Sequence, residues 1–165
     1  MGKYVLKVIA ACEIVGAVIG GIIVYEMLRF AEVEPEQQPL FIVLVSVLGL
    51  ATLLALVAGV LLWASRPAGL GLSLVVQALQ VPLITSSGLK YKLMFGVGAW
   101  VCVEPGEELS VRVPINFGAA EAIAINPDLP LLVGLNLVAL SFFAVLLRAL
   151  LRERRGPLAP PAQAH

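Results

Sequence analysis

The sequence predicts an integral membrane protein, an all-α bundle of four transmembrane helices with an extracytoplasmic β-hairpin inserted between helices 3 and 4. Three observations predict this class: an apolar composition, four apolar runs of helical length, and one stretch in which apolar residues alternate. Of the 165 residues, 60% are hydrophobic and 13% are charged, whereas soluble domains are ~45–50% apolar and ~25% charged. An ordinary cytosolic enzyme and a disordered chain are therefore both poor fits.

Four runs have the ~17–25 mostly apolar residues that a transmembrane helix needs. We predict helices at residues 4–28, 40–64, 68–84 and 129–147, the last extending as far as 151. The second run is the most apolar, and the third is the shortest and contains Gln77, Gln80 and Pro82. Asp128 would cap the fourth helix, with Pro130 in its first turn.

These runs divide the chain into four parts. They are helices one to three at 1–84, the hairpin insert at 85–128, helix four at 129–151, and a basic, then Pro- and Ala-rich tail at 152–165 that we expect to be disordered. With the N-terminus inside, seven of the eleven Lys and Arg residues lie on the cytoplasmic side, namely Lys3, Lys7, Arg66, Arg148, Arg152, Arg154 and Arg155. Because basic residues accumulate on that side, we expect both termini to be cytoplasmic.

The insert alternates apolar and polar residues in two runs on either side of the turn signal at 104–107, which predicts two strands. A three-residue loop pairs residue 101 with 111 and 97 with 115, and it keeps all apolar residues on one face. That face comprises Leu93, Phe95, Val97, Val101, Leu109, Val111, Val113, Ile115 and Phe117. The same register places Trp100 opposite Arg112 as a cation–π pair.

An isolated hairpin is only marginally stable in water, so this apolar face must lie against something. Its own helices, the membrane surface and another subunit are the three candidates. We favour a cap over the hairpin's own helices, with docking of a partner as the second choice.

Glu13 is a carboxylate in the middle of the first run, at a cost of ~2.5–3.5 kcal/mol on insertion scales, and should face the protein interior. At ~1.5 Å rise per residue, Gln77, Ser141 and the slightly deeper Thr52 fall near the same depth, which predicts an intramembrane polar layer. Because the predicted spans hold no Lys or Arg at that depth, we expect Glu13 to be mostly protonated and to donate a hydrogen bond.

Gly16 and Gly20 follow Glu13 on the same face of the helix in a GxxxG pattern, which allows another helix to approach closely. Polar residues on such a face are most often contacts that hold helices together. The alternative is a small oligomeric channel or transporter that uses Glu13 as a proton or cation site. Carriers often show internal repeats and broken helices, but Pro82 is the one breaker well inside a span and the sequence has no repeat.

The sequence contains no signature of catalysis or of metal binding. Cys12 and Cys102 are ninety residues apart without a CxxC pair, and the common hydrolase, nucleotide-binding and metalloprotease motifs are absent. We therefore expect no enzyme activity, no cofactor and no metal. Eleven basic residues balance eleven acidic residues, which argues against a nucleic-acid partner.

Three short segments, RPAGLGLS at 66–73, QALQVP at 77–82 and GLKYK at 88–92, resemble small four-span membrane proteins of bacteria. The resemblance covers about a quarter of the chain, and it implies no activity. It suggests the bacterial cytoplasmic membrane as the location. Taken together, we expect a non-catalytic accessory or interaction subunit of a membrane assembly, with the lipid bilayer and other membrane subunits, or a second copy of the chain, as partners.

Overall fold

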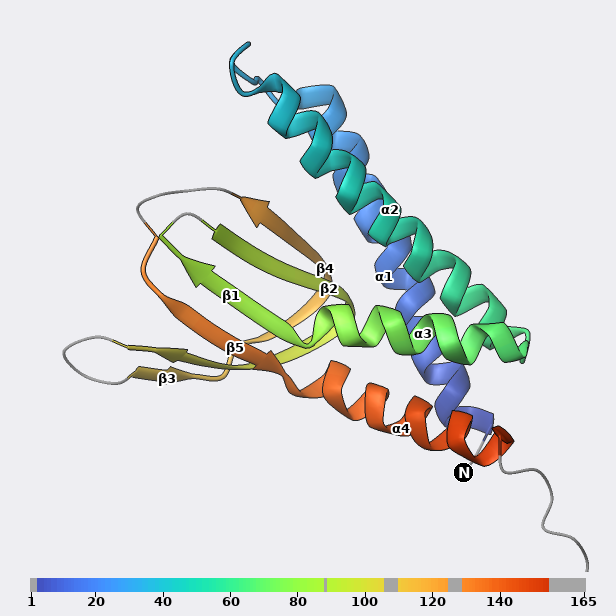
Figure 1. Ribbon diagram of the computed structural model, residues 1–165. Helices are drawn as coiled ribbons and strands as arrows, with labels where there is room; N and C mark the ends of the chain where they lie inside the picture. Colours follow the sequence, from blue (N-terminus) through green and yellow to red (C-terminus); the bar gives the residue numbers. More distant parts are fainter. Residues whose placement is uncertain (1–2, 88, 106–109, 125–128, 155–165) are drawn as a thin grey trace, which may run out of the picture.

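The computed structural model describes residues 3–87, 89–105, 110–124 and 129–154 (Figure 1). Four helices and a five-stranded sheet form from these residues. The helices are α1 (Lys3–Phe30), α2 (Gln38–Trp63), α3 (Pro67–Gln80) and α4 (Leu137–Arg154). The strands are β1 (Pro82–Ser86), β2 (Leu89–Glu104), β3 (Ser110–Arg112), β4 (Ile115–Ala124) and β5 (Leu132–Asn136).

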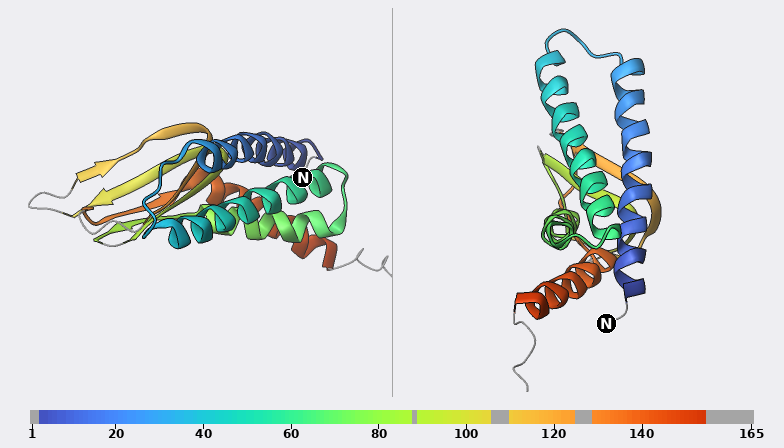
Figure 2. Two further views of the ribbon diagram at one scale, coloured as in Figure 1. Left: turned by 90° about the horizontal axis from the view of Figure 1, so that it is seen from above. Right: turned by 90° about the vertical axis from the view of Figure 1, so that its right-hand side faces the viewer.

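The two long helices, α1 and α2, form an antiparallel hairpin, and α3 and α4 form a shorter pair that crosses it (Figures 1 and 2). The sheet lies to one side of the long hairpin (Figure 1). It is continuous with the short helices, since α3 leads directly into β1 and β5 leads directly into α4. The N-terminal end of α1 and the C-terminal end of α4 lie at the same end of the molecule (Figure 1).

Among the described residues, α1 and α2 alone are long and apolar enough to cross a membrane. Their 28 and 26 residues correspond to about 40 Å, against a hydrocarbon core of ~30 Å. The third helix has 14 residues, which is roughly 21 Å. The predicted bundle of four membrane-spanning helices is therefore not supported.

The apolar runs predicted as helices three and four are each divided between a helix and a strand. Pro82, which lacks a backbone N–H and cannot continue a helix, begins β1. The second division is at Asn136, whose side-chain Oδ1 accepts hydrogen bonds from the backbone N–H groups of Val138 (3.1 Å) and Ala139 (3.3 Å) and caps α4. The predicted cap, Asp128, lies outside the described residues.

The insert is part of a curled sheet rather than a separate hairpin. One edge of the long strand β2 pairs first with β1 and then with β5, and β1 and β5 also pair with each other. These three strands therefore close into a ring. The other edge of β2 pairs with β4 and β3. The sequence pattern detects β2 and its return strand but misses β1 and β5.

The register between β2 and its return strand differs from the predicted one by two residues. Val103 pairs with Val111, and Val97 pairs with Phe117. A shift of two leaves every side chain on its original face, so alternation alone cannot distinguish the two registers. The predicted pair of Trp100 with Arg112 is wrong for this reason.

Trp100 and Arg112 each have other neighbours in the structure. The Trp100 backbone N–H donates to the Pro114 carbonyl (3.0 Å), and Lys92 Nζ lies 5.7 Å from the centroid of the Trp100 ring. Arg112 is opposite Cys102 and forms an ion pair with Glu104 (3.3 Å).

The predicted apolar face is divided into a buried and an exposed part. Leu93 and Phe95 of β2 are buried in a cluster with Ala17 of α1, Ala55 of α2 and Val76 of α3. Val97 and Val101 are half-buried, and Leu109 lies outside the described residues. The return strand is exposed, at Val111, Val113, Ile115 and Phe117. The opposite face of β2 has its own cluster inside the curl, formed by Leu83, Met94, Trp100 and Cys102.

Candidate functional site

A buried carboxyl group joins α1 to α3. The Glu13 side chain has 0% of its surface exposed. The Ser73 hydroxyl donates to its Oε2 (2.7 Å), and the Gln77 amide Nε2 donates to its Oε1 (2.8 Å). Both donors lie on α3 and are themselves buried. Two hydrogen bonds to one carboxyl group therefore offset its removal from solvent.

The spacing of the polar residues on α3 explains how they reach two neighbours at once. Ser73, Gln77 and Gln80 are four and three residues apart, so they form one stripe on the helix. Gln80 is buried, and its Oε1 accepts a hydrogen bond from the backbone N–H of Phe95 in β2 (2.7 Å). We call Glu13, Ser73, Gln77 and Gln80 the polar clamp, because together they connect α1, α3 and β2.

Glycines bring the backbones around this clamp into close contact. A Cβ added at Gly16 would overlap the backbone of Phe95 and Gly96 in β2. A Cβ at Gly96, where φ is +94°, would lie 2.7 Å from the Cys12 carbonyl oxygen. On the other side of Glu13, a Cβ at Gly59 of α2 would lie 3.0 Å from the Ala10 carbonyl oxygen. Gly16 therefore allows close approach, but of a strand rather than the predicted helix.

The structure brings only part of the predicted polar layer together. Glu13 and Gln77 are in direct contact. Thr52 is buried on α2. Ser141 is exposed and donates to the Leu137 carbonyl of its own helix (2.7 Å), so it is not part of the clamp. Depth along a helix does not determine which way a side chain points, which is why Ser141 was wrongly included.

Ser73, Gln80 and Gly20 are the other residues of this region that bear on the prediction. Ser73 was not predicted, although its place four residues before Gln77 was an available signal. Gln80 was not placed in the predicted polar layer, and it binds the sheet. Gly20 is buried on the same face of α1 as Gly16.

The clamp is a set of hydrogen bonds around one carboxyl group. In the part of the chain that the structure describes, Glu13 has neutral partners, and a serine hydroxyl can either donate or accept a hydrogen bond. The clamp is therefore compatible with either protonation state of Glu13, and donation by Glu13 stays a prediction. No group of three His, Cys, Asp or Glu side chains among the described residues could hold a metal ion. Comparisons with protein-family models, curated proteins and solved structures give no match to this chain.

Proposed function

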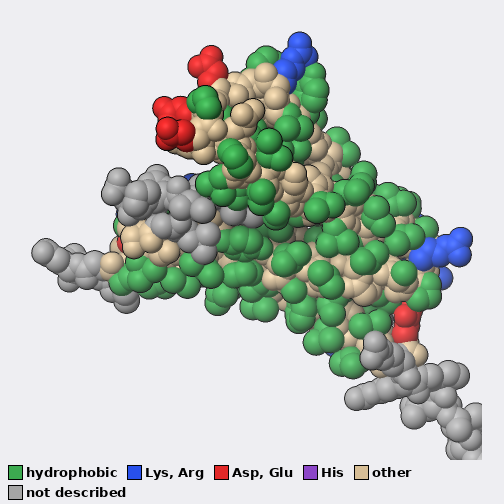
Figure 3. Space-filling model, turned by 45° about the horizontal axis from the view of Figure 1, so that its top comes forward, with side chains coloured by type: hydrophobic (Ala, Val, Ile, Leu, Met, Phe, Trp, Pro, Cys, Tyr) green, Lys and Arg blue, Asp and Glu red, His purple; other side chains and the backbone are tan. Residues whose placement is uncertain are grey.

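We propose that the chain is a non-catalytic integral membrane protein, anchored by α1 and α2, that serves as an accessory or interaction subunit of a membrane assembly. The surface of the long hairpin supports the anchor. Large apolar side chains are exposed along the whole length of both helices, including Val8, Val18 and Ile22 on α1. Apolar side chains cover most of the face in Figure 3, and charged side chains gather at its ends.

Aromatic residues at both ends of α1 support the same placement. Tyr4 and Tyr25 are exposed and are 21 residues, or about 31 Å, apart along the helix. This separation matches a hydrocarbon core of ~30 Å, and tyrosine and tryptophan favour its two boundaries. Lys7 lies over the exposed Trp63 ring at one end (5.1 Å), and Arg29 lies over Tyr25 at the other (5.9 Å).

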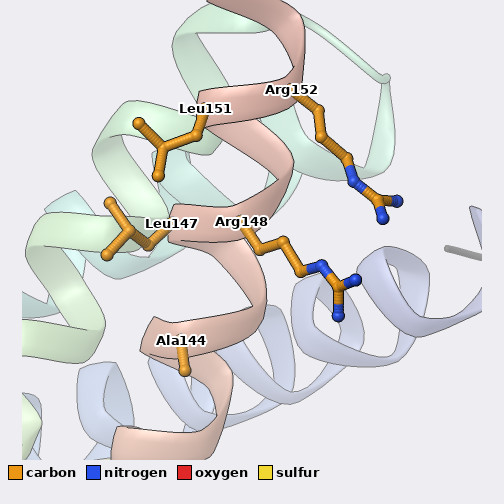
Figure 4. A pocket seen from close by; sticks show the side chains of 5 residues that line it. All are labelled: Ala144, Leu147, Arg148, Leu151 and Arg152. Atoms are coloured by element: carbon orange, nitrogen blue, oxygen red, sulfur yellow. The ribbon is translucent and has the colours of Figure 1, made fainter.

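The basic end of the molecule supports a cytoplasmic location for both termini. Leu6, Arg66 and Glu153 line one small cavity, so the start of α1, the α2–α3 turn and the end of α4 meet there. Nearby on α4, Arg148 and Arg152 extend from the same side of the helix (Figure 4), and both line an open surface pocket of about 430 Å³. Basic residues at one end are typical of the cytoplasmic side of a bacterial inner-membrane protein.

One observation carries the interaction role: the sheet joins α1 at its middle, and the edge of the sheet is open there. Gly16, which contacts Gly96, is near the midpoint of α1. Gly118 of β4 lies beside Ile19 of α1, and among the described strands β4 pairs only with β2. If α1 crosses the membrane, this edge is at hydrocarbon depth, where lipid cannot satisfy its free N–H and C=O groups.

A protein partner would resolve this difficulty. Alternate residues of the return segment form an exposed apolar face next to the open edge, namely Val111 (57%), Val113 (60%), Ile115 (63%) and Phe117 (78%). A strand or helix of another subunit could cover the apolar face and pair with the edge of β4, as in strand addition. The enclosed position of Glu13 favours a packing role for that residue over the alternative of a proton or cation site.

A photo-reactive amino acid at Phe117, activated in native membranes, tests the interaction role. We expect a protein adduct of one defined mass, because position 117 lies at the covered edge. Val133 is the matched control, since it is also exposed but belongs to β5, which is paired on both edges. Adducts with lipid alone, or equal protein adducts from both positions, would contradict the proposal. An adduct with a second copy only would favour the homo-oligomeric alternative.

A further inference from the structure

The curled sheet borders an open cavity of about 600 Å³ on the side of β2 that faces away from the helices. A volume of ~300–1,000 Å³ is typical of sites for small ligands. The ring of β1, β2 and β5 forms its wall, and the end of β3 contributes to its rim. The cavity is separate from the polar clamp, because none of the four clamp residues lines it.

Three cations from different parts of the sheet meet at this cavity. Lys90, Lys92 and Arg112 all line it, and they are the three Lys and Arg residues between positions 82 and 136. The register separates two of them along β2, because Lys90 is opposite Thr85 of β1, whereas Arg112 is opposite Cys102 near the far end of β2. The curl of the sheet brings both to the same cavity. The lining residues that the structure describes include no Asp or Glu. Arg112 is paired with Glu104, which lies outside the lining (3.3 Å), so Lys90 and Lys92 are the cations without an acidic partner among the described residues.

The other lining residues are mostly apolar. They are Leu83, Cys102, Val113, Pro114 and Leu132, with Thr85 as a hydroxyl donor. Trp100 packs against this floor, in one cluster with Leu83, Cys102 and Leu132. Its buried indole N–H has no hydrogen-bond acceptor among the described residues. The cavity thus combines cationic donors at the rim with an apolar floor.

We propose that this cavity binds the anionic headgroup and the adjoining acyl segment of a membrane lipid. An anion satisfies the convergent Lys and Arg donors, and an acyl segment fits the apolar floor better than water does. The position of the cavity agrees with this ligand. Lys90 is six residues from Gly96, up to roughly 20 Å along β2. This reach exceeds half the hydrocarbon thickness, so a strand that contacts the middle of α1 can bring Lys90 to the headgroups.

The test uses Trp100 as the reporter in the full-length chain. A Trp63→Phe background leaves Trp100 as the only tryptophan. The purified protein in a nonionic detergent is titrated with brominated phosphatidylglycerol and with brominated phosphatidylcholine of the same acyl chains. Bromine quenches tryptophan fluorescence at short range. We expect saturable quenching of Trp100 by the anionic lipid at a concentration roughly tenfold lower, because charged hydrogen bonds discriminate on this scale.

Substitutions identify the residues responsible. Lys90→Gln and the double variant Lys90→Gln/Lys92→Gln should progressively remove the preference for the anionic lipid. Lys90 has no contact with the Trp100 ring among the described cation–π pairs, so the single variant separates binding from disturbance of the reporter. The matched control is Arg148→Gln/Arg152→Gln, which removes two charges at the other end of the molecule and should preserve the preference.

Three results would overturn the inference. They are equal quenching by the two lipids, an unchanged preference in the Lys90→Gln/Lys92→Gln variant, and loss of the preference in the Arg148→Gln/Arg152→Gln control. Inorganic phosphate at the same concentrations should neither displace the lipid nor change Trp100 fluorescence. Full displacement by phosphate would show a site for free anions instead of lipid. The proposed interaction role does not depend on this site and is tested separately at Phe117.

Discussion

At the scale of single residues, the fold depends on one carboxyl group placed among neutral donors. Glu13 is costly to bury, and Ser73 and Gln77 offset this cost with two short hydrogen bonds. The presence of Glu13 and Gln77 at similar depth could be predicted from the sequence, because polar residues stand out in apolar runs. Ser73 was missed although its spacing of four residues from Gln77 was available, whereas the outward direction of Ser141 could not be predicted, because depth does not specify helix phase.

The effect of replacing Glu13 on stability should depend on whether the new side chain can still accept hydrogen bonds from Ser73 and Gln77. Glu13→Leu leaves the Ser73 hydroxyl and the Gln77 amide buried without their partner, so we expect a loss of roughly 1–3 kcal/mol. Glu13→Gln retains an acceptor and the shape, and its loss should be smaller. Thermal unfolding in detergent measures both.

The matched control for this series is Ser141→Ala. Ser141 is exposed and bonds only its own helix backbone in the described structure, so its loss should stay within about 0.5 kcal/mol. Equal stability of Glu13→Leu and Ser141→Ala would contradict a structural role for the clamp. Unchanged assembly and unchanged ion flux in Glu13→Gln would exclude the transport alternative.

At the scale of elements, the sequence predicts α1 and α2 well and the remaining elements in part. Long uniform apolar runs favour long helices over strands. The runs at 68–84 and 129–147 are shorter, and short apolar stretches fit a buried strand as well as a helix. The sheet register was missed by two residues because an even shift preserves the pattern of alternation. Contacts between distant strands, such as β1 with β5, leave no local signal.

Two glycines of α1 allow a test of the close contact between α1 and β2. Gly16→Ala places a methyl group against the backbone of β2, which cannot move as a flexible side chain could. We expect a loss of about 1–3 kcal/mol from overpacking. Gly21→Ala is the control, since a Cβ there meets nothing within 4 Å, and it should stabilise α1 by roughly 0.5–1 kcal/mol. Thermal unfolding that gives both variants the same sign would contradict the observed crossing.

At the scale of the whole molecule, a long apolar hairpin carries a sheet at its midpoint and a basic surface at one end. The zero net charge of the sequence conceals this separation of charge along the molecule. The hydrophobic residues likewise lie on two kinds of surface. Those on the helices are suited to contact with lipid, and those on the sheet need to be covered by something other than lipid. Every proposal made for the sheet depends on α1 and α2 crossing the membrane.

Labelling from one side of the membrane tests this central claim most directly. In a Cys12→Ser/Cys102→Ser background, single cysteines replace Lys3, Arg152 or Glu34, the last in the connection between α1 and α2. With a membrane-impermeant maleimide and intact bacterial cells, we expect labelling at position 34 and, only after permeabilisation, labelling at positions 3 and 152. Labelling of all three positions in intact cells, or protection of position 34 together with the other two, would contradict a hairpin that crosses the membrane with its basic end inside.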